Sequence, residues 1–404
     1  MNFCRATFFA TLLLIRHAAA QEFFDRLDQR LTVSAFDDQV RTRVSGTLDL
    51  EFYAFDLPAP GLIDSRGNTL FNPRLSLFVD SQLGPAVYFF SQVRVDRHFD
   101  PTDAGAQIRL DEYALRITPW SDGRLNLQFG KFATVIGRWV QRHLSWDNPF
   151  LNAPLIYENI TAIEDRRAPA FTADLDRALR DPKYEYNPVI WGPSYTTGAA
   201  AAGRLGQFDY ALEFKNAPLS SRPESWDANR VDFSRPTFSG RLGFRPNETW
   251  NFGLSASSGA YFREEAAASL PRGRSLRDYQ QRFLAQDVTY EWHHLQVWAE
   301  FHEARFEVPR VGHADVFGYF LEAKYKFAPQ FFGALRWNQQ LYGDVPDGTG
   351  GEISWGRDAW RLDTAVAYRF TENIQLKLQY DLAHDDNGRH GFGHSLGTQL
   401  TVRF

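Results

Sequence analysis

Apolar and polar residues alternate strictly along many segments of this chain. In the final segment, His394–Phe404, the apolar residues Leu396, Leu400, Val402 and Phe404 share one row, and mostly polar residues lie between them. A period of two places these two sets on opposite faces of a β-strand. Because the same alternation recurs throughout the chain, the pattern predicts an all-β protein built from many antiparallel strands.

The alternating segments predict about sixteen strands, most of them close to the length that a tilted strand needs to cross a membrane. The predicted strands are Val44–Ala54, Pro73–Ser81, Ala86–Asp96, Gln107–Thr118, Arg124–Phe132, Val189–Ala199, Gln207–Lys215, Pro236–Arg245, Thr249–Gly259, Gln281–Trp292, His294–His302, Ala314–Phe327, Gln330–Gln340, Ala359–Phe370, Asn373–Ala383 and Gly393–Phe404. Soluble sandwiches and propellers also alternate, with the apolar face inward. Their strands are shorter, about five or six residues. Strand length and the terminal aromatic residue therefore favour a transmembrane antiparallel β-barrel.

The connections between these strands alternate between short and long. Short connections such as Ala328-Pro329 and Thr371-Glu372 follow every second strand, and longer ones such as Glu303–His313 lie between them. Membrane barrels of bacteria have short periplasmic turns and long outer loops. The rhythm therefore requires an even number of strands and places both ends of the barrel in the periplasm.

The first residues have the pattern of a secretory signal. Arg5 precedes the apolar run Ala6–Ile15, and Ala18–Ala20 supply small residues for cleavage. The run is far shorter than the roughly 20 residues of a transmembrane helix. We expect residues 1–20 to be a signal peptide, residues 21–43 to be a periplasmic segment and residues 44–404 to form the barrel. Helix-like spacing in Glu22–Leu31 and a short strand at Leu31–Phe36 leave open whether residues 21–43 also pair with the barrel.

Composition agrees with this class. Aromatic residues make up 15% of the chain, yet the mean hydropathy is −0.40, as expected when each strand is half apolar and half polar. A formal charge of −5 argues against the basic face that nucleic-acid binding needs. The one cysteine, Cys4, lies in the predicted signal peptide, so the mature chain has no disulfide or thiolate metal site. No pattern indicates a cofactor.

One connection, Ala133–Pro188, is too long to be a simple loop, and long loops are usually functional. It is rich in Trp, Tyr and Phe, so we expect it to fold inward, pack on the inner wall and constrict the lumen. It carries both signs of charge, and its predicted constriction residues are Arg138, Arg142, Asp147, Glu158, Glu164 and Asp165. An external cap or an oligomer contact is the alternative.

Alternation also assigns side chains to the lumen, where basic residues slightly outnumber acidic ones. The predicted pore-lining set is Arg94, Arg241, Arg336, Arg361 and Lys377. Because rings of fixed charge select ions by sign, this wall predicts weak selectivity with a slight preference for anions. The alternative is that these cations pair with wall acids and select nothing.

Aromatic residues are also predicted to face inward, namely Tyr88, Phe90, Trp298, Phe320 and Phe332. Two interpretations stay open for them. They form a track along which sugar rings slide, or they fill the barrel wall beneath the inward-folded loop.

Two segments resemble those of Gram-negative outer-membrane porins of the general-diffusion and phosphate-selective types. One is the terminal Leu400–Phe404, and the other is Leu125–Phe132, which leads into the long loop and is followed by Gly137. The resemblance implies a passive, water-filled channel in the bacterial outer membrane, often a homotrimer. Its partners would be outer-membrane lipid, lipopolysaccharide and small hydrophilic solutes. The lysine ladder of phosphate-selective members is not matched in this lysine-poor chain.

Three hypotheses follow from the sequence. The first is a weakly selective porin, with a sugar-selective channel as a variant. The second is a barrel that sheathes another protein, such as an electron-transfer partner. The third is a barrel enzyme, but the G-x-S-x-G match at Gly393–Gly397 opens the last strand, where the helix that this motif needs has no room. We therefore expect no catalytic activity.

Overall fold

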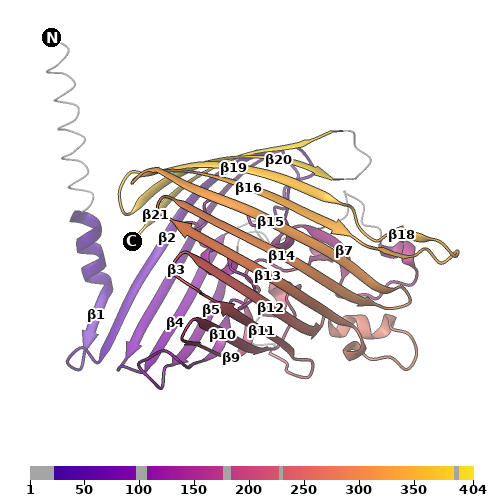
Figure 1. Ribbon diagram of the computed structural model, residues 1–404, viewed down its shortest axis with the longest axis horizontal. Helices are drawn as coiled ribbons and strands as arrows, with labels where there is room; N and C mark the ends of the chain where they lie inside the picture. The colour runs from indigo at the N-terminus through magenta and orange to yellow at the C-terminus, as the bar shows by residue number, and fades with distance from the viewer. Residues whose placement is uncertain (1–21, 97–106, 176–182, 227–230, 386–390) are drawn as a thin grey trace, which may run out of the picture.

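The computed structural model describes residues 22–96, 107–175, 183–226, 231–385 and 391–404. The 17-stranded sheet of these residues consists of β1 and sixteen longer strands (17 − 1). The sixteen strands close into a barrel, because β2 pairs antiparallel with both β3 and β21 (Figure 1). The predicted antiparallel barrel of sixteen strands is confirmed.

The barrel strands are β2 (Val40–Phe55), β3 (Thr69–Leu83), β4 (Val87–Asp96), β5 (Gln107–Ile117), β6 (Asn126–Phe132), β9 (Thr196–Leu205), β10 (Phe208–Lys215), β11 (Thr237–Phe244), β12 (Trp250–Ala260), β13 (Gln280–Trp292), β14 (Leu295–Val308), β15 (Gly312–Ala328), β16 (Phe331–Tyr342), β19 (Ala359–Arg369), β20 (Ile374–Asp385) and β21 (Gly393–Arg403). The short strands are β1 (Thr32–Ala35), β7 (Ile160–Glu164), β8 (Tyr186–Pro188), β17 (Asp344–Pro346) and β18 (Glu352–Ser354). The 3-10 helices are η1 (Trp139–Arg142), η2 (Leu155–Tyr157), η3 (Thr172–Leu175), η4 (Lys183–Glu185), η5 (Pro223–Trp226), η7 (Glu264–Ser269) and η8 (Leu276–Asp278).

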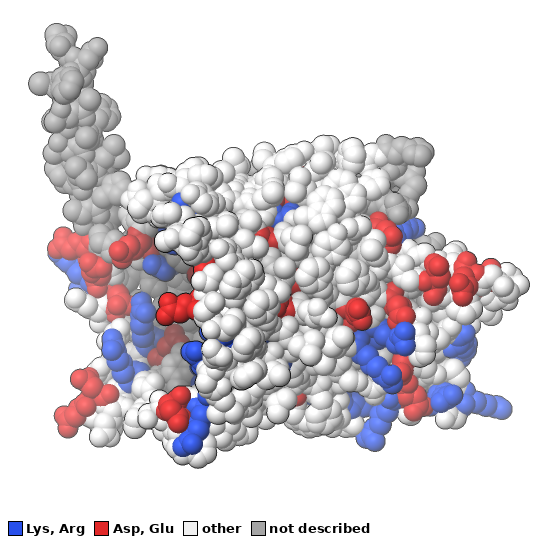
Figure 2. Space-filling model, in the orientation of Figure 1, with Lys and Arg blue, Asp and Glu red and all other residues white. Residues whose placement is uncertain are grey.

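The two faces of the barrel are arranged as the alternation predicts. On β20, Leu378 and Tyr380 are 49% and 43% exposed on the outer face, whereas Lys377 and Gln379, which alternate with them, are buried in the lumen. Between its charged ends, the visible wall is largely free of charged side chains (Figure 2). This inverted arrangement suits a wall surrounded by hydrocarbon. Among the described residues no helix is long and apolar enough to cross a membrane.

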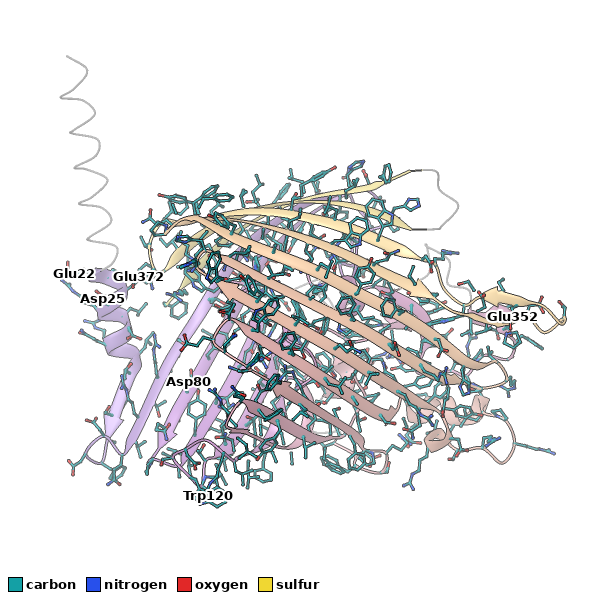
Figure 3. All side chains as sticks on the ribbon, viewed as in Figure 1. Glu22, Asp25, Asp80, Trp120, Glu352 and Glu372 are labelled. Carbon is teal, nitrogen blue, oxygen red and sulfur yellow. The ribbon has the colours of Figure 1, made fainter. Side chains whose placement is uncertain are left out.

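Short and long connections lie at opposite ends of the barrel. Trp120 and Glu372, both in short connections, lie at one end, and Glu352 of β18 lies at the other (Figure 3). We call these the turn end and the loop end. The described part of the N-terminal segment and the C-terminus both lie at the turn end (Figure 1), as predicted.

Two of the predicted boundaries differ most from the structure. The sixth barrel strand is β9, not Val189–Ala199, because Gly192 and Ser194 adopt positive φ on either side of Pro193 and break an extended run. The central loop therefore extends to Tyr195. The predicted loop Glu303–His313 is mostly strand, since β14 and β15 pair as far as Val308 and Gly312.

The segment before the barrel contains a helix at residues 22–31 and then β1, which pairs only with the first residues of β2. β2 begins at Val40, ahead of the predicted Val44, and β1 adds no crossing to the barrel. The predicted signal peptide and the predicted loop Arg97–Ala106 lie outside the described residues.

Candidate functional site in the lumen

We call the described residues of the connection between β6 and β9, 133–175 and 183–195, the central loop, and most of their apolar side chains are buried inside the barrel. Its apolar residues join three buried clusters, the largest of which includes residues of the inner wall. From the loop, Ile136, Trp139 and Tyr157 join this largest cluster, and Trp298 and Phe320 join it from β14 and β15. The prediction of an inward-folded loop is confirmed. Trp298 and Phe320 fill the wall beneath the loop, so they form no exposed track.

The Glu300 carboxylate on β14 holds the central loop through three hydrogen bonds and has a fourth polar contact on its own strand. It accepts from the backbone N–H groups of Arg138 and Trp139 at 2.7 and 2.6 Å. It also accepts from the Tyr157 hydroxyl at 2.6 Å and contacts His302 Nε2 at 3.0 Å. Glu300 is fully buried. One carboxylate on the wall therefore fixes both the first turn of η1 and the end of η2.

Gly137 shows how closely this part of the loop approaches the wall. Its φ is +72°, in the left-handed region, and an added Cβ would overlap the Tyr157 hydroxyl and the Glu300 carboxylate. Only glycine meets both conditions without strain. The glycine that follows β6 in the sequence is therefore required by the seating of the loop.

Charges of the loop and the wall pair in both directions. From the loop, Arg142 bonds Glu322, and its guanidinium lies 4.2 Å from the centre of the Trp298 ring. From the wall, Arg361 bonds loop residue Glu158 and lies 2.6 Å from Asp363. These pairs neutralise the centre of the lumen.

Two other predicted pore-lining arginines, Arg241 and Arg336, also form ion pairs with carboxylates. Arg241 bonds Asp287 at 2.7 Å and Asp209 at 2.6 Å. Arg336 is fully buried, bonds Asp363 at 2.7 Å and donates to the Asn152 side chain. Carboxylates therefore neutralise the charges of both arginines.

Buried lysines bind backbone carbonyls. Lys377 Nζ donates to the carbonyl oxygens of Ser145 and Asn148 at 2.6 and 2.9 Å. Lys215 Nζ donates to those of Phe132 and Thr196 at 2.6 and 2.9 Å, where the central loop leaves β6 and enters β9. These lysines fasten the loop, and Lys377 is not a free pore-lining charge.

The structure does not bring all the predicted constriction residues together. Arg138, whose Nε lies 3.5 Å from Asp287, lies at the centre with Arg142 and Glu158. Asp147 is exposed. Glu164 ends β7 and bonds Arg167 at 3.0 Å, and Asp165 bonds Arg222 of the following connection at 2.7 Å. Glu164 and Asp165 therefore do not line a constriction.

Two adjoining cavities lie between the central loop and one side of the wall. The outer cavity, of about 840 Å³, is enclosed by the loop end of β19–β21 together with residues 56–61, 353–357 and part of the central loop. The inner cavity, of about 100 Å³, lies deeper, against β2, β3, β4 and β21. Pro60, Asp381 and Ser395 line both cavities. The space left in the lumen therefore runs along this side of the wall.

Arg74 and Arg94 are the cations of the inner cavity. Arg94 was predicted, and it lies 3.0 Å from Asp111. Arg74 was missed, although its spacing of two from Asn72 and Ser76 places it on the same row. Asp111 was missed for a different reason. Pairing of β4 with β5 shifts register between Gln92 and Val93, and this bulge reverses the row of side chains that faces inward.

His143 faces the same cavity from the central loop. Its Nε2 lies 2.5 Å from the Tyr195 hydroxyl and its Nδ1 lies 2.5 Å from the Val140 carbonyl oxygen. The carbonyl can only accept, so Nδ1 carries the proton and Nε2 accepts from Tyr195. Burial lowers the pKa of His143 to about 4, so the ring is neutral at pH 7.

Towards the turn end, lumen-facing cations remain without ion pairs among the described residues. These are Arg116, Lys324, Lys326, Arg369 and Arg403, which we call the vestibule cations. Several lie over aromatic rings. Lys324 is 4.6 Å from the centre of the Phe332 ring, and Arg369 and Arg403 are 5.0 and 4.1 Å from that of Trp146. Phe332, one of the aromatic residues predicted to face inward, lies beneath the Lys324 charge.

The two reactive residues of the G-x-S-x-G match lie on different faces of the last strand. His394 and Ser395 are neighbours on β21 and face opposite sides, with His394 bonded at 2.7 Å to the Tyr380 hydroxyl on the outer face. Ser395 is buried in the lumen.

A closed antiparallel barrel with an apolar outer belt, a polar inner face and a loop folded into its lumen defines the class of bacterial outer-membrane barrels of porin type. No family model and no curated protein matches the sequence. Solved structures share the fold.

OmpT, an outer-membrane protein of Vibrio cholerae, matches with a TM-score of 0.55 at 10% identity, over 92% of this chain and 100% of its own. Salmonella typhi OmpF in complex with daunomycin has the same values. The anion-selective porin from Comamonas acidovorans has a TM-score of 0.55 at 9% identity, over 90% of this chain and 100% of its own. The predictions of a porin-like fold and of the outer membrane are confirmed.

Proposed function

We propose that the chain forms a narrow passive channel for small hydrophilic solutes, weakly selective with a slight preference for anions. The observation that carries this proposal is the pair of adjoining cavities beside the central loop. They provide a route along β2–β4 and β19–β21 with charged, polar and aromatic residues in its lining, whereas apolar packing seals the opposite side of the loop against β14 and β15. The central loop, held against the barrel wall, limits the size of the solutes that can pass.

The vestibule cations support the preference for anions. At the centre of the lumen, Arg241, Arg336 and Arg361 are neutralised by carboxylates within hydrogen-bonding distance. At the turn end the cations have no such partners, so their field acts on ions in the vestibule. The likeness in fold to an anion-selective porin points in the same direction.

Planar-bilayer recording tests both parts of the proposal. Steps of constant size would support a channel, and the absence of conductance would refute it and favour the sheath or scaffold hypothesis. In a salt gradient, the reversal potential should show a modest preference for chloride over potassium. A preference for potassium would refute the anionic preference.

Two charge reversals locate the source of that preference. Lys326→Glu changes an exposed vestibule cation and should shift the reversal potential towards cations. Arg274→Glu, in an exposed connection between β12 and β13, is the matched control and should leave it unchanged. Arg241 and Arg336 are unsuitable for this test because reversing them would break buried ion pairs.

We also propose a homotrimer without enzymatic activity. A solved structure with this fold, OmpT of Vibrio cholerae, is described as a trimer form. Migration of unheated protein on a denaturing gel, before and after cross-linking, tests the trimer. A single monomer-sized species in both would refute it.

A further inference from the structure

The inner cavity combines aromatic rings with a balanced set of charges. The aromatic residues that line it are Tyr53, Trp139, Phe150, Tyr157, Trp191, Tyr195 and Trp226. The charged residues are two guanidinium groups, Arg74 and Arg94, and two carboxylates, Glu158 and Asp381. Small amide and hydroxyl groups, among them Asn148 and Gln399, complete the lining.

The rings from the loops follow one another as a row. Tyr157 and Trp139 have centroids 4.6 Å apart, Trp139 and His143 6.2 Å, and His143 and Tyr195 5.8 Å. Trp226, from the connection after β10, continues the row at 5.8 Å from Tyr195. The row lines the same cavity as the arginines of β3 and β4.

One donor in this lining lacks a partner. Trp139 is only 4% exposed, and its indole Nε1 has no hydrogen-bond partner among the described residues. A buried donor without a partner is costly unless water or a ligand satisfies it. The cavity can supply that partner, because about 100 Å³ holds several waters.

We propose that the inner cavity is a recognition site for a single neutral sugar ring. A pyranose ring presents a flat C–H face that can pack on aromatic rings, and its rim of hydroxyls can both donate and accept. The lining offers both features, and its two positive and two negative charges give no net preference for an ion. Aromatic and polar groups converging in a concave pocket are typical of small-molecule sites.

This substrate class rests on the proposed channel function, but it arises from a different part of the lumen. The vestibule cations act on ions at the turn end, whereas the inner cavity acts on the shape of the solute. A weak anion preference and a preference for a ring-shaped neutral solute are therefore compatible.

Swelling of proteoliposomes tests the proposal with three uncharged solutes. Glycerol reports whether the channel is open. D-glucose and its acyclic counterpart D-sorbitol are similar in size and in hydroxyl content, but only glucose has a ring. We expect glucose to enter faster than sorbitol by roughly 2- to 10-fold, the range that one aromatic contact supports.

Trp139→Leu should bring this ratio close to one while glycerol entry continues. Trp226→Leu is a second variant with the same expectation, in case Trp139→Leu does not fold. Trp337→Leu is the matched control, since Trp337 stacks on Trp360 on the outer face of the barrel and should leave the ratio unchanged.

The outcomes separate the two proposals. Glycerol entry with equal rates for glucose and sorbitol would overturn the sugar site and leave the channel standing. If glycerol does not enter, the channel fails, and glucose binding to the detergent-solubilised protein, followed by tryptophan fluorescence, decides the site. Binding that Trp139→Leu abolishes would support the site, and no binding would overturn it. Tighter binding of benzoate or choline than of glucose would also overturn it, because it would show that the cavity selects a charge.

Discussion

Removing the Glu300 carboxylate should release the central loop from the barrel wall. Glu300→Ala deletes the shared acceptor of the Arg138 and Trp139 amides and of the Tyr157 hydroxyl, all within 2.7 Å of it. Since Glu300 is fully buried, no solvent is present to replace it. The substitution therefore leaves three donors in the packed loop without a partner.

The magnitude follows from these donors. A hydrogen bond to a charged group contributes about 1.5–3 kcal/mol, so three of them give at least about 4.5 kcal/mol. Removing the buried charge returns part of its desolvation cost, and breaking a buried ionic network typically costs about 3–5 kcal/mol net. Because each 1.36 kcal/mol is a factor of ten, the population of the released loop should rise roughly a thousandfold.

Single-channel recording and hydrogen exchange measure this release. Glu300→Ala should give larger and noisier current steps and faster exchange of the amides in η1. Glu303→Ala on the same strand is the matched control, because Glu303 is exposed, and it should behave like the wild-type protein. Tyr157→Phe removes only one of the bonds and should have a smaller effect. If Glu300→Ala kept wild-type current steps and exchange, the carboxylate would not be what holds the loop.

Further predictions concern the same loop. Gly137→Ala should destabilise its packing by about 1–3 kcal/mol, because the left-handed backbone at this position is strained for alanine and its Cβ meets Tyr157; faster proteolysis of the loop would show this. Lys377→Met removes two bonds to loop carbonyls and should cost about 2–4 kcal/mol in urea unfolding, whereas an unchanged midpoint would contradict the role assigned to that lysine. Burial lowers the pKa of His143 to about 4. Below about pH 6.5, His143 therefore binds a proton when the loop is released but stays neutral when the loop is packed. The packing should therefore lose about 3 kcal/mol as pH falls from 6.5 to 4, and current noise should rise over that interval in the wild-type protein but not in His143→Leu.

The strands were predictable because each carries its own pattern. On β19 and β20, alternation of apolar and polar residues fixes both the strand and its faces, since one-residue errors would bury charge in lipid. Prediction of the strands failed where a local sequence pattern resembles a strand but packing against distant residues determines the conformation. The segment Val189–Tyr195 was predicted to be the first part of a strand, yet its apolar residues pack inside the lumen as part of the central loop.

The partners of the buried charged residues could not be predicted from the sequence. Tyr157 and Glu300 are 143 positions apart, and nothing in either segment identifies the other as its partner. Arg241 and Arg336 were predicted to line the pore because alternation places them in the lumen, but alternation does not show which acids on neighbouring strands lie beside them. At Asp111 a single bulge reversed the inward row, and a bulge of this kind has no clear signal in one sequence.

The two sides of the central loop explain why solutes would take one route and not the other. Against β14 and β15 the loop packs with Trp298 and Phe320, so water is excluded there. Against β2–β4 and β19–β21 it faces a mixture of charged, polar and aromatic residues, and the cavities lie on this side. The bonds of Glu300 hold the loop on its sealed side. Their loss would therefore expose the aromatic wall to water, and a second route would open beside the first. For that reason the current of Glu300→Ala should increase while the glucose preference of the channel falls, because solutes could then bypass the inner cavity.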